Sequence, residues 1–344
     1  MTITRRNLLA TGLSLPLASA LLAMPGVAAA QDAKPKSKLI VGTQDAGFPH
    51  IAEASGAYRD APYEVEWAVL PGPAAQFPAL YSKSVDIGWL GDTSLILEQA
   101  KSTTPWTPDT APLRIVAGWR NFDPQFRQLV TVVRNSADVK SLADLRGKKW
   151  AFNYGGINHL QYVLSLVKAG LQESDIEPVQ LGDGFQAAAA FNAGRTDVYS
   201  GDFVRVKDLV DKGEARILLN GDDLGIPGLT VYATRQDVLQ DPERKKQLAD
   251  FLERGRKLWA WYDANLPVVA KIYVDKVKYT PEKAEAQAGR NKSQFVPIDA
   301  KLLKEEQNIA DVLFERGFIK NKVDVNAGFS GDYNVFTIGG AAAQ

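Results

Sequence analysis

Short apolar runs that alternate with amphipathic stretches are the feature that most limits the folds open to this chain of 344 residues. The runs have the length of buried strands, and the stretches between them, such as Asn158–Ala169, have helical periodicity. Strands that alternate with helices pair in parallel, so the pattern predicts an α/β fold with mainly parallel sheets flanked by helices. The expected strands are Leu39–Val41, Tyr63–Leu70, Val85–Leu90, Leu113–Trp119, Leu129–Val133, Lys149–Phe152, Glu177–Leu181, Asp197–Ser200, Ala215–Leu219 and Thr230–Thr234.

A weak internal repeat, with a period of about 110 residues, divides this pattern into two units. Val85-Asp86-Ile87-Gly88 and Thr196-Asp197-Val198-Tyr199 each follow a strand and a helix. Two similar lobes with a cleft between them would result, and the chain would cross between them twice. We expect a discontinuous lobe 1 (residues 38–125 plus 235–344) and a lobe 2 (residues 126–234).

Composition excludes several classes of chemistry. The 40 Lys and Arg residues balance 40 Asp and Glu residues, which argues against a nucleic-acid-binding protein, because such proteins carry a basic stripe. The chain has no Cys, so it can form no disulfide, thiolate nucleophile, zinc finger or iron–sulfur cluster. It has two His residues, His50 and His159, and we expect neither a metal site nor a cofactor.

Residues 1–30 have the pattern of an export signal. Arg5 and Arg6 precede an apolar run, and a small-residue segment ends at Ala30. A transmembrane anchor is the alternative, and Pro16 and Pro25 argue against it. We therefore predict a signal peptide over residues 1–30, cleavage near Gln31 and a periplasmic protein. The paired arginines resemble a twin-arginine signal, and the general export route stays open.

Two strand-to-helix turns are candidate anion sites. Gly91-Asp92-Thr93-Ser94 follows an apolar strand, and Gly155-Gly156-Ile157-Asn158-His159 follows another. The free N–H groups and the dipole of a helix N-terminus attract anions, and at the carboxyl end of a strand they face the crevice of an α/β sheet. Asp, Thr and Ser are also ordinary N-cap residues, so plain helix capping remains the alternative.

Further candidates lie at other predicted strand ends. Gln44 and Asp202 each come within three residues after an expected strand, and Arg120 could supply a counter-charge to an anionic ligand. Trp89 and Phe203 lie at strand ends too, where aromatic residues serve either the rim of the core or a ligand. No Ser-His-Asp arrangement, HExxH motif or phosphate-binding loop is present, so we assign no catalytic residue.

Several segments resemble the aliphatic-sulfonate- and taurine-binding periplasmic proteins of ABC importers. They are Asp86–Thr93, Ser141–Lys149, Leu164–Leu171 and, near the C-terminus, Val323–Val325. The similarity covers nearly the whole chain after the predicted signal peptide, and the Ser141–Lys149 segment is also shared with nitrate- and thiamine-precursor-binding relatives.

The resemblance implies a two-lobed periplasmic binding protein fold of type II, with a hinged cleft that holds the anionic head of the ligand. It places Gln44, the Gly91–Thr93 turn, the Gly155–His159 turn and Asp202 around that cleft. It also implies a monomer that delivers an organosulfonate to a membrane permease and that is not an enzyme. A sulfinate desulfinase of this fold uses a Cys nucleophile, which this chain lacks.

Departures from the family pattern bear on the ligand. The family often has Tyr where Trp89 stands, a Trp-Asp-Pro run where this chain has Gly201-Asp202-Phe203, and a Ser-rich turn where this chain has Gly155–His159. A Gly in place of Trp opens space, which favours a bulky or aromatic sulfonate. Nitrate, a thiamine precursor or another small ligand stays open, as does an exported enzyme on the same scaffold.

Overall fold

The computed structural model describes residues 36–123, 129–154 and 156–338. The predicted signal peptide and Gly155 lie outside these residues. Within them, no helix has both the length and the apolar character that a membrane span requires.

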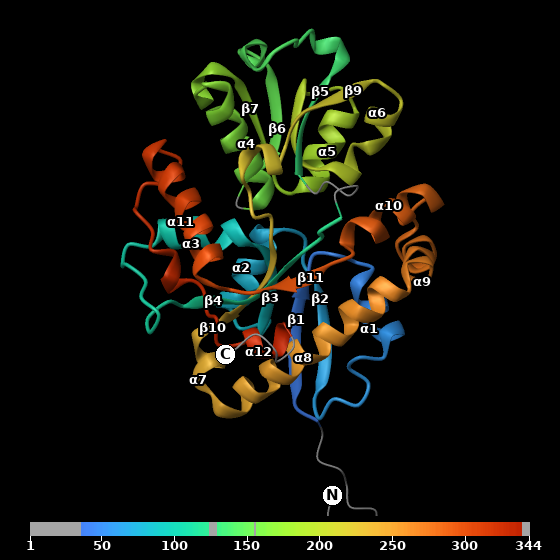
Figure 1. Ribbon diagram of the computed structural model, residues 1–344, viewed down its shortest axis with the longest axis vertical. Coiled ribbons are helices and arrows are strands. Elements are labelled where there is room, and N and C mark those ends of the chain that lie inside the picture. Colours follow the sequence, from blue (N-terminus) through green and yellow to red (C-terminus); the bar gives the residue numbers. More distant parts are fainter. Residues whose placement is uncertain (1–35, 124–128, 155, 339–344) are drawn as a thin grey trace, which may run out of the picture. The chain divides into compact units, whose positions relative to one another are not determined.

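A six-stranded mixed sheet forms the first half of the structure (Figure 1). β1 pairs in parallel with β2 and β3, whereas β10 runs antiparallel to β3 and β4, and β11 antiparallel to β4. In spatial order the strands are β11 (Gln294–Val296), β4 (Leu113–Arg120), β10 (Thr230–Arg235), β3 (Ile87–Gly91), β1 (Lys38–Thr43) and β2 (Glu64–Val69).

Helices cover both faces of this sheet. α1 (Phe48–Ser55) and α8 (Pro242–Ala264) share one apolar cluster with Trp89, Trp119 and Tyr232 of the sheet. The cluster on the other face takes in α2 (Pro73–Tyr81), α3 (Asp92–Lys101) and α11 (Ala300–Glu315). The remaining helices are α7 (Gln236–Gln240), α9 (Leu266–Ile272), α10 (Pro281–Asn291) and α12 (Asn334–Thr337).

A five-stranded mixed sheet forms the second half. β6 pairs in parallel with β7 and β8, and β5 runs antiparallel to β8 and β9. Its helices are α4 (Ile157–Ala169), α5 (Gly184–Asn192) and α6 (Lys207–Asp211). The strands in spatial order are β7 (Glu177–Leu181), β6 (Lys149–Asn153), β8 (Val198–Asp202), β5 (Leu129–Arg134) and β9 (Ala215–Asn220).

The structure confirms the α/β class and corrects two details. The sheets are mixed rather than mainly parallel, because the first strand after each crossing, β5 or β10, runs antiparallel to its neighbours. The predicted boundary between residues 234 and 235 is wrong as a sheet boundary, because β10 pairs with β3 and β4. The second crossing therefore comes before Thr230. β11 was not predicted, since three residues carry no periodic signal.

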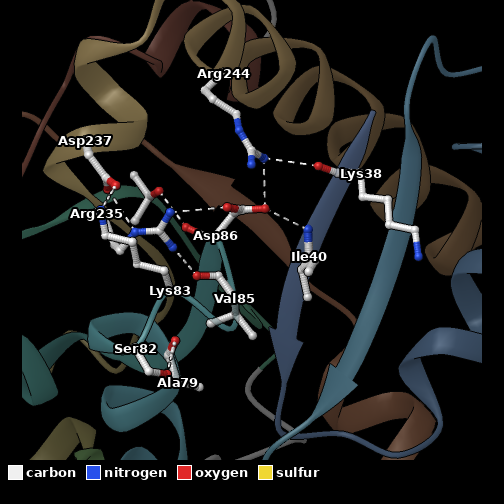
Figure 2. A network of polar contacts seen from close by, with 11 residues as sticks. Lys38, Ile40, Ala79, Ser82, Lys83, Val85, Asp86, Arg235, Asp237 and Arg244 are labelled. Carbon is white, nitrogen blue, oxygen red and sulfur yellow. Dashed lines mark hydrogen bonds and ion pairs between the residues drawn. The ribbon is translucent and has the colours of Figure 1, made fainter. Parts of the chain in front are cut away.

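A buried ion-pair network fixes the first sheet (Figure 2). The Asp86 carboxylate accepts hydrogen bonds from Ile40 N at 2.9 Å and Arg244 Nη1 at 3.0 Å, and Arg235 Nη2 lies 3.3 Å away. These contacts join β1, the start of β3, the end of β10 and α8. They hold β1 and β3 in a fixed register, so that the carboxyl ends of both strands reach the same edge of the sheet.

Candidate functional site

A cavity of about 340 Å³ lies where strand ends from the two sheets meet. The carboxyl ends of strands are where α/β sheets place their ligand sites. Its walls include residues that follow or end strands, residues that begin α4 and α5, and residues of α10. Those that the argument uses are Gln44, Asp45, Trp89, Gly91, Trp119, Ile157, Asn158, Phe185, Asp202, Arg205, Trp259, Tyr279, Arg290 and Asn291.

Two guanidinium groups face a single buried carboxylate in this cavity. Asp202, the last residue of β8, accepts a hydrogen bond from Arg290 Nε at 2.8 Å and lies 3.5 Å from Arg205 Nε. Arg205 comes three residues after Asp202, whereas Arg290 belongs to α10 beside the other sheet. Burial lowers the pKa of Arg290, but the Asp202 carboxylate outweighs that effect and holds the pKa above its ordinary value.

The guanidinium of Arg205 has donors to spare. It lies over the Phe185 ring, 3.5 Å from the ring centroid, and its Nε, although 3.5 Å from the Asp202 carboxylate, makes no hydrogen bond to any described residue. A Cβ placed on Gly184 would lie 2.8 Å from Asn158 Nδ2 and 3.7 Å from Arg205 Nε. The side chains of Asn158 and Arg205 therefore converge on Gly184, and they bring the guanidinium next to the start of α4.

The N-terminus of α4 is open to the cavity. Its N-cap residue is Gly156, which supplies no side-chain cap. His159 N and Leu160 N bond to the Gly156 carbonyl, whereas the N–H groups of Ile157 and Asn158 have no acceptor among the described residues. Ile157 and Asn158 both line the cavity. Unpaired amides at a helix N-terminus favour an anion, so α4 and Arg205 together form an anion-binding corner.

The N-terminus of α3 is filled by the chain's own carboxylate. Asp92 Oδ1 accepts from Thr93 N at 2.6 Å and from Thr93 Oγ1 at 3.0 Å, and Asp92 Oδ2 accepts from Leu229 N at 2.7 Å. Asp92 and Thr93 are fully buried, and burial raises the pKa of Asp92. The structure therefore does not bring these two predicted residues to the cavity, although Gly91 does line it.

Other predicted residues also lie away from the cavity wall. Arg120 donates to Pro227 O at 3.0 Å, and Phe203 packs beside the cluster between α5 and its sheet. His159 stacks on Phe152, and burial lowers its pKa to about 4, so it is a neutral packing residue. Gly156 caps α4 without lining the cavity. Gln44, Trp89, Gly91, Asn158 and Asp202 are the predicted residues that the cavity brings together.

A larger groove of about 710 Å³ has Arg120 and Trp259 in its wall, and two of its other cations form ion pairs. Lys292 forms an ion pair with Asp263 at 2.8 Å, and Arg256 pairs with Glu253 at 2.8 Å. The groove thus offers less to a charged ligand than the cavity around Arg205. Among the described residues, no cluster of three metal-binding side chains is present.

Sequence reasoning missed Asp45, Arg205 and Arg290. Asp45 lies next to Gln44 and accepts from Gly47 N at 2.8 Å, from Asn291 Nδ2 at 2.9 Å and from the Tyr273 hydroxyl. Desolvation raises its pKa, and the hydrogen bond from Tyr273 offsets part of that rise. The place of Asp45 and Arg205 near strand ends could have revealed them, whereas no strand-end signal marks Arg290.

The chain is similar to a family model and to a named protein. The model of the NMT1/THI5-like family matches residues 46–261. A protein of Escherichia coli (strain K12) that is named for binding aliphatic sulfonates is 25% identical over 315 residues, which cover 89% of this chain and 92% of that protein.

Solved structures give the same fold. The alkanesulfonate-binding protein SsuA from Xanthomonas axonopodis pv. citri, bound to MOPS, has a TM-score of 0.72 and 24% identity, and the match covers 87% of this chain and 99% of that one. The desulfurization enzyme DSZB has a TM-score of 0.58 and 12% identity, over 88% of this chain and 99% of that one. The chain therefore has the periplasmic binding protein fold, on which both binding proteins and an enzyme are built.

Proposed function

Because the chain belongs to the NMT1/THI5-like family, we propose that it is the substrate-binding component of an ABC importer and binds an organic sulfonate in the 340 Å³ cavity. The names of its relatives support this substrate class, since the E. coli relative is named for aliphatic sulfonates and SsuA for alkanesulfonates. The sequence has no Cys and no recognisable pairing of a nucleophile with a general base, which favours a binding protein over an enzyme.

The observation that carries the proposal is the Arg205 guanidinium beside the open N-terminus of α4. Its Nε has no hydrogen-bond partner among the described residues and lies 3.5 Å from the Asp202 carboxylate. A sulfonate is a permanent anion with three acceptor oxygens. The guanidinium can donate to one or two of these oxygens, and the N–H groups of Ile157 and Asn158 can donate to the third.

The rest of the cavity suits an apolar body on that head. Trp89, Trp119, Trp259, Phe185 and Tyr279 line it, and such rings bury large apolar groups. A bulky or aromatic sulfonate would therefore use more of the wall than a short alkyl one. The Arg205 guanidinium stacks on one face of the Phe185 ring. Phe185 therefore lies between the anion-binding corner and the apolar part of the wall.

Export and partner follow from the same proposal. Residues 1–30 would direct the chain to the periplasm, by the twin-arginine or the general route, and a monomer would deliver its ligand to a membrane permease. The two halves would act as hinged lobes that meet around the ligand, as Arg290 and Asp202 already do across the two sheets.

Arg205→Gln tests the function directly. It removes the charge and keeps a polar side chain, so affinity for benzenesulfonate should fall by about 10- to 150-fold, the effect of losing one or two charge-assisted hydrogen bonds. Isothermal titration calorimetry on the mature protein would measure this, together with a panel of alkyl and aryl sulfonates.

Arg195→Gln is the matched control, because Arg195 is exposed in the same half of the structure and the same charge is removed. It should bind as the parent does. A parent protein that binds no sulfonate in the panel, or an Arg205→Gln protein that binds as tightly as the control, would contradict the proposal.

A further inference from the structure

The charges in the cavity wall balance one another. The described wall holds two guanidinium groups, Arg205 and Arg290, and two carboxylates, Asp45 and Asp202. Among the described residues of the wall, the other electrostatic attraction for an anion comes from the N-terminus of α4, which acts as roughly half a positive charge. A ligand with one negative charge can be accommodated by this arrangement, whereas a second negative charge would find no further cation among the described residues of the wall.

Asp202 is the carboxylate that a ligand's head would meet. It is 4% exposed and bridges the two guanidiniums, with Oδ1 2.8 Å from Arg290 Nε and Oδ2 3.5 Å from Arg205 Nε. Any anion that contacts Arg205 therefore lies within a few ångströms of a fixed negative charge.

Asp202 cannot easily swing away. Its backbone is fixed, because it ends β8 in register with Leu129 of β5 and its carbonyl accepts from the Tyr199 hydroxyl at 3.3 Å. Its carboxylate is held by the hydrogen bond from Arg290 Nε at 2.8 Å. Asp45 has its oxygens bonded to Gly47, Asn291 and Tyr273, whereas Asp202 is the carboxylate in direct contact with Arg205. The negative charge that a ligand would meet is therefore that of Asp202.

We infer that Asp202 is a specificity-determining residue that limits the ligand to a singly charged head and excludes doubly charged heads such as phosphonates, phosphate monoesters and sulfate. This inference rests on the proposed sulfonate-binding function and adds the reason for its charge selection. Like charges a few ångströms apart in a partly desolvated site repel strongly, whereas the same charges on an exposed surface are screened. The position of Asp202 makes the penalty grow with each further charge on the head.

Benzenesulfonate and phenylphosphonate form a matched pair of probes. They share the phenyl ring and three head oxygens, but at about pH 8.5 the sulfonate carries one charge and the phosphonate close to two. By calorimetry, the parent protein should bind the sulfonate at least about tenfold more tightly. In Asp202→Asn, which keeps an acceptor for Arg290, that ratio should shrink by about tenfold or more.

Asp208→Asn is the control, because Asp208 is an exposed carboxylate in the same half and its loss changes the net charge equally. It should leave the ratio unchanged. If Asp202→Asn does not fold, Asp202→Ser is the second variant, since its hydroxyl can still accept from Arg290. A parent that binds both probes equally, or a folded Asp202 variant with the parent's ratio, overturns the inference and leaves the sulfonate function standing. A parent that binds neither probe overturns both.

Discussion

Gly184→Ala should weaken ligand binding without unfolding the protein. The new Cβ would lie 2.8 Å from Asn158 Nδ2 and 3.3 Å from Asn153 Oδ1, which is closer than ordinary van der Waals contact. These two atoms form a hydrogen bond of 2.8 Å, so the methyl group would push the Asn158 side chain off its partner. The displaced amide would then intrude on the space between α4 and Arg205, where we propose the sulfonate head to bind.

The two expected effects differ in size. Losing the Asn158–Asn153 hydrogen bond costs about 0.5–1.5 kcal/mol of folding stability, whereas Ala in place of Gly at the start of a helix returns up to about 1 kcal/mol. The free energy of unfolding should therefore change by no more than about 1.5 kcal/mol. If the intruding amide prevents one charge-assisted hydrogen bond, affinity for benzenesulfonate falls by about 10- to 150-fold.

Calorimetry and urea denaturation on the same samples would separate these effects. Gly182→Ala is the matched control, because it makes the same change two residues earlier, where a Cβ would meet the side chain of Gln186 at 3.4 Å. We expect it to bind as the parent does. If Gly184→Ala binds benzenesulfonate within about twofold of Gly182→Ala, the corner between α4 and Arg205 does not hold the head.

Two further predictions concern stability. Asp86→Ala should lower the free energy of unfolding by about 3 kcal/mol, because it removes the buried carboxylate that pairs with Arg235 and Arg244 and leaves the buried Arg235 with the half-exposed Asp237 as its partner. Asp237→Ala, at the half-exposed end of the same network, should cost about 1 kcal/mol or less by urea denaturation. Glu306 is fully buried against Asp92, and burial raises its pKa well above 4.5, so the folded state binds a proton that the unfolded state releases. Its contribution to stability is present below pH 4.5 and is lost as the pH rises toward the folded pKa. Glu306→Gln should thus match the parent at about pH 4 and become the more stable protein at about pH 8; a difference that stays constant between these values would refute this assignment.

Strand-end positions in the sequence predicted part of the cavity wall. Gln44, Gly91, Asn158 and Asp202 each follow or end a predicted strand, and the parallel strands of each sheet bring such residues to one edge. This geometry depends only on the order of strands and helices, which the periodicity of the sequence contains. Strand order could not predict Arg290, because α10 follows no strand of the sheet that holds Asp202. No local sequence pattern indicates that Arg290 contacts Asp202.

The direction in which Asp92 points was equally beyond local pattern. A carboxylate at a helix start can face a cavity or cap its own chain, and the outcome here depends on Leu229, which lies 137 positions later. Only the path of the second crossing brings the Leu229 N–H to Asp92 Oδ2 at 2.7 Å. The sequence predicted an anion-binding helix N-terminus at the start of α3. In the fold, the carboxylate of Asp92 itself is the anion at that N-terminus.

This difference between α3 and α4 explains why the proposed ligand head has one helix N-terminus rather than two. α3 begins with Asp92, so the chain supplies the anion and uses it to hold Leu229 in the second crossing, while Arg120 holds Pro227 of the same segment at 3.0 Å. α4 begins after Gly156, which has no side chain to offer, so its first amides stay open to the cavity. The turns before α3 and α4 both join a strand to a helix, but they have different roles. The turn before α3 fixes the crossing between the sheets, whereas the turn before α4 leaves a helix N-terminus that we propose binds the anionic ligand.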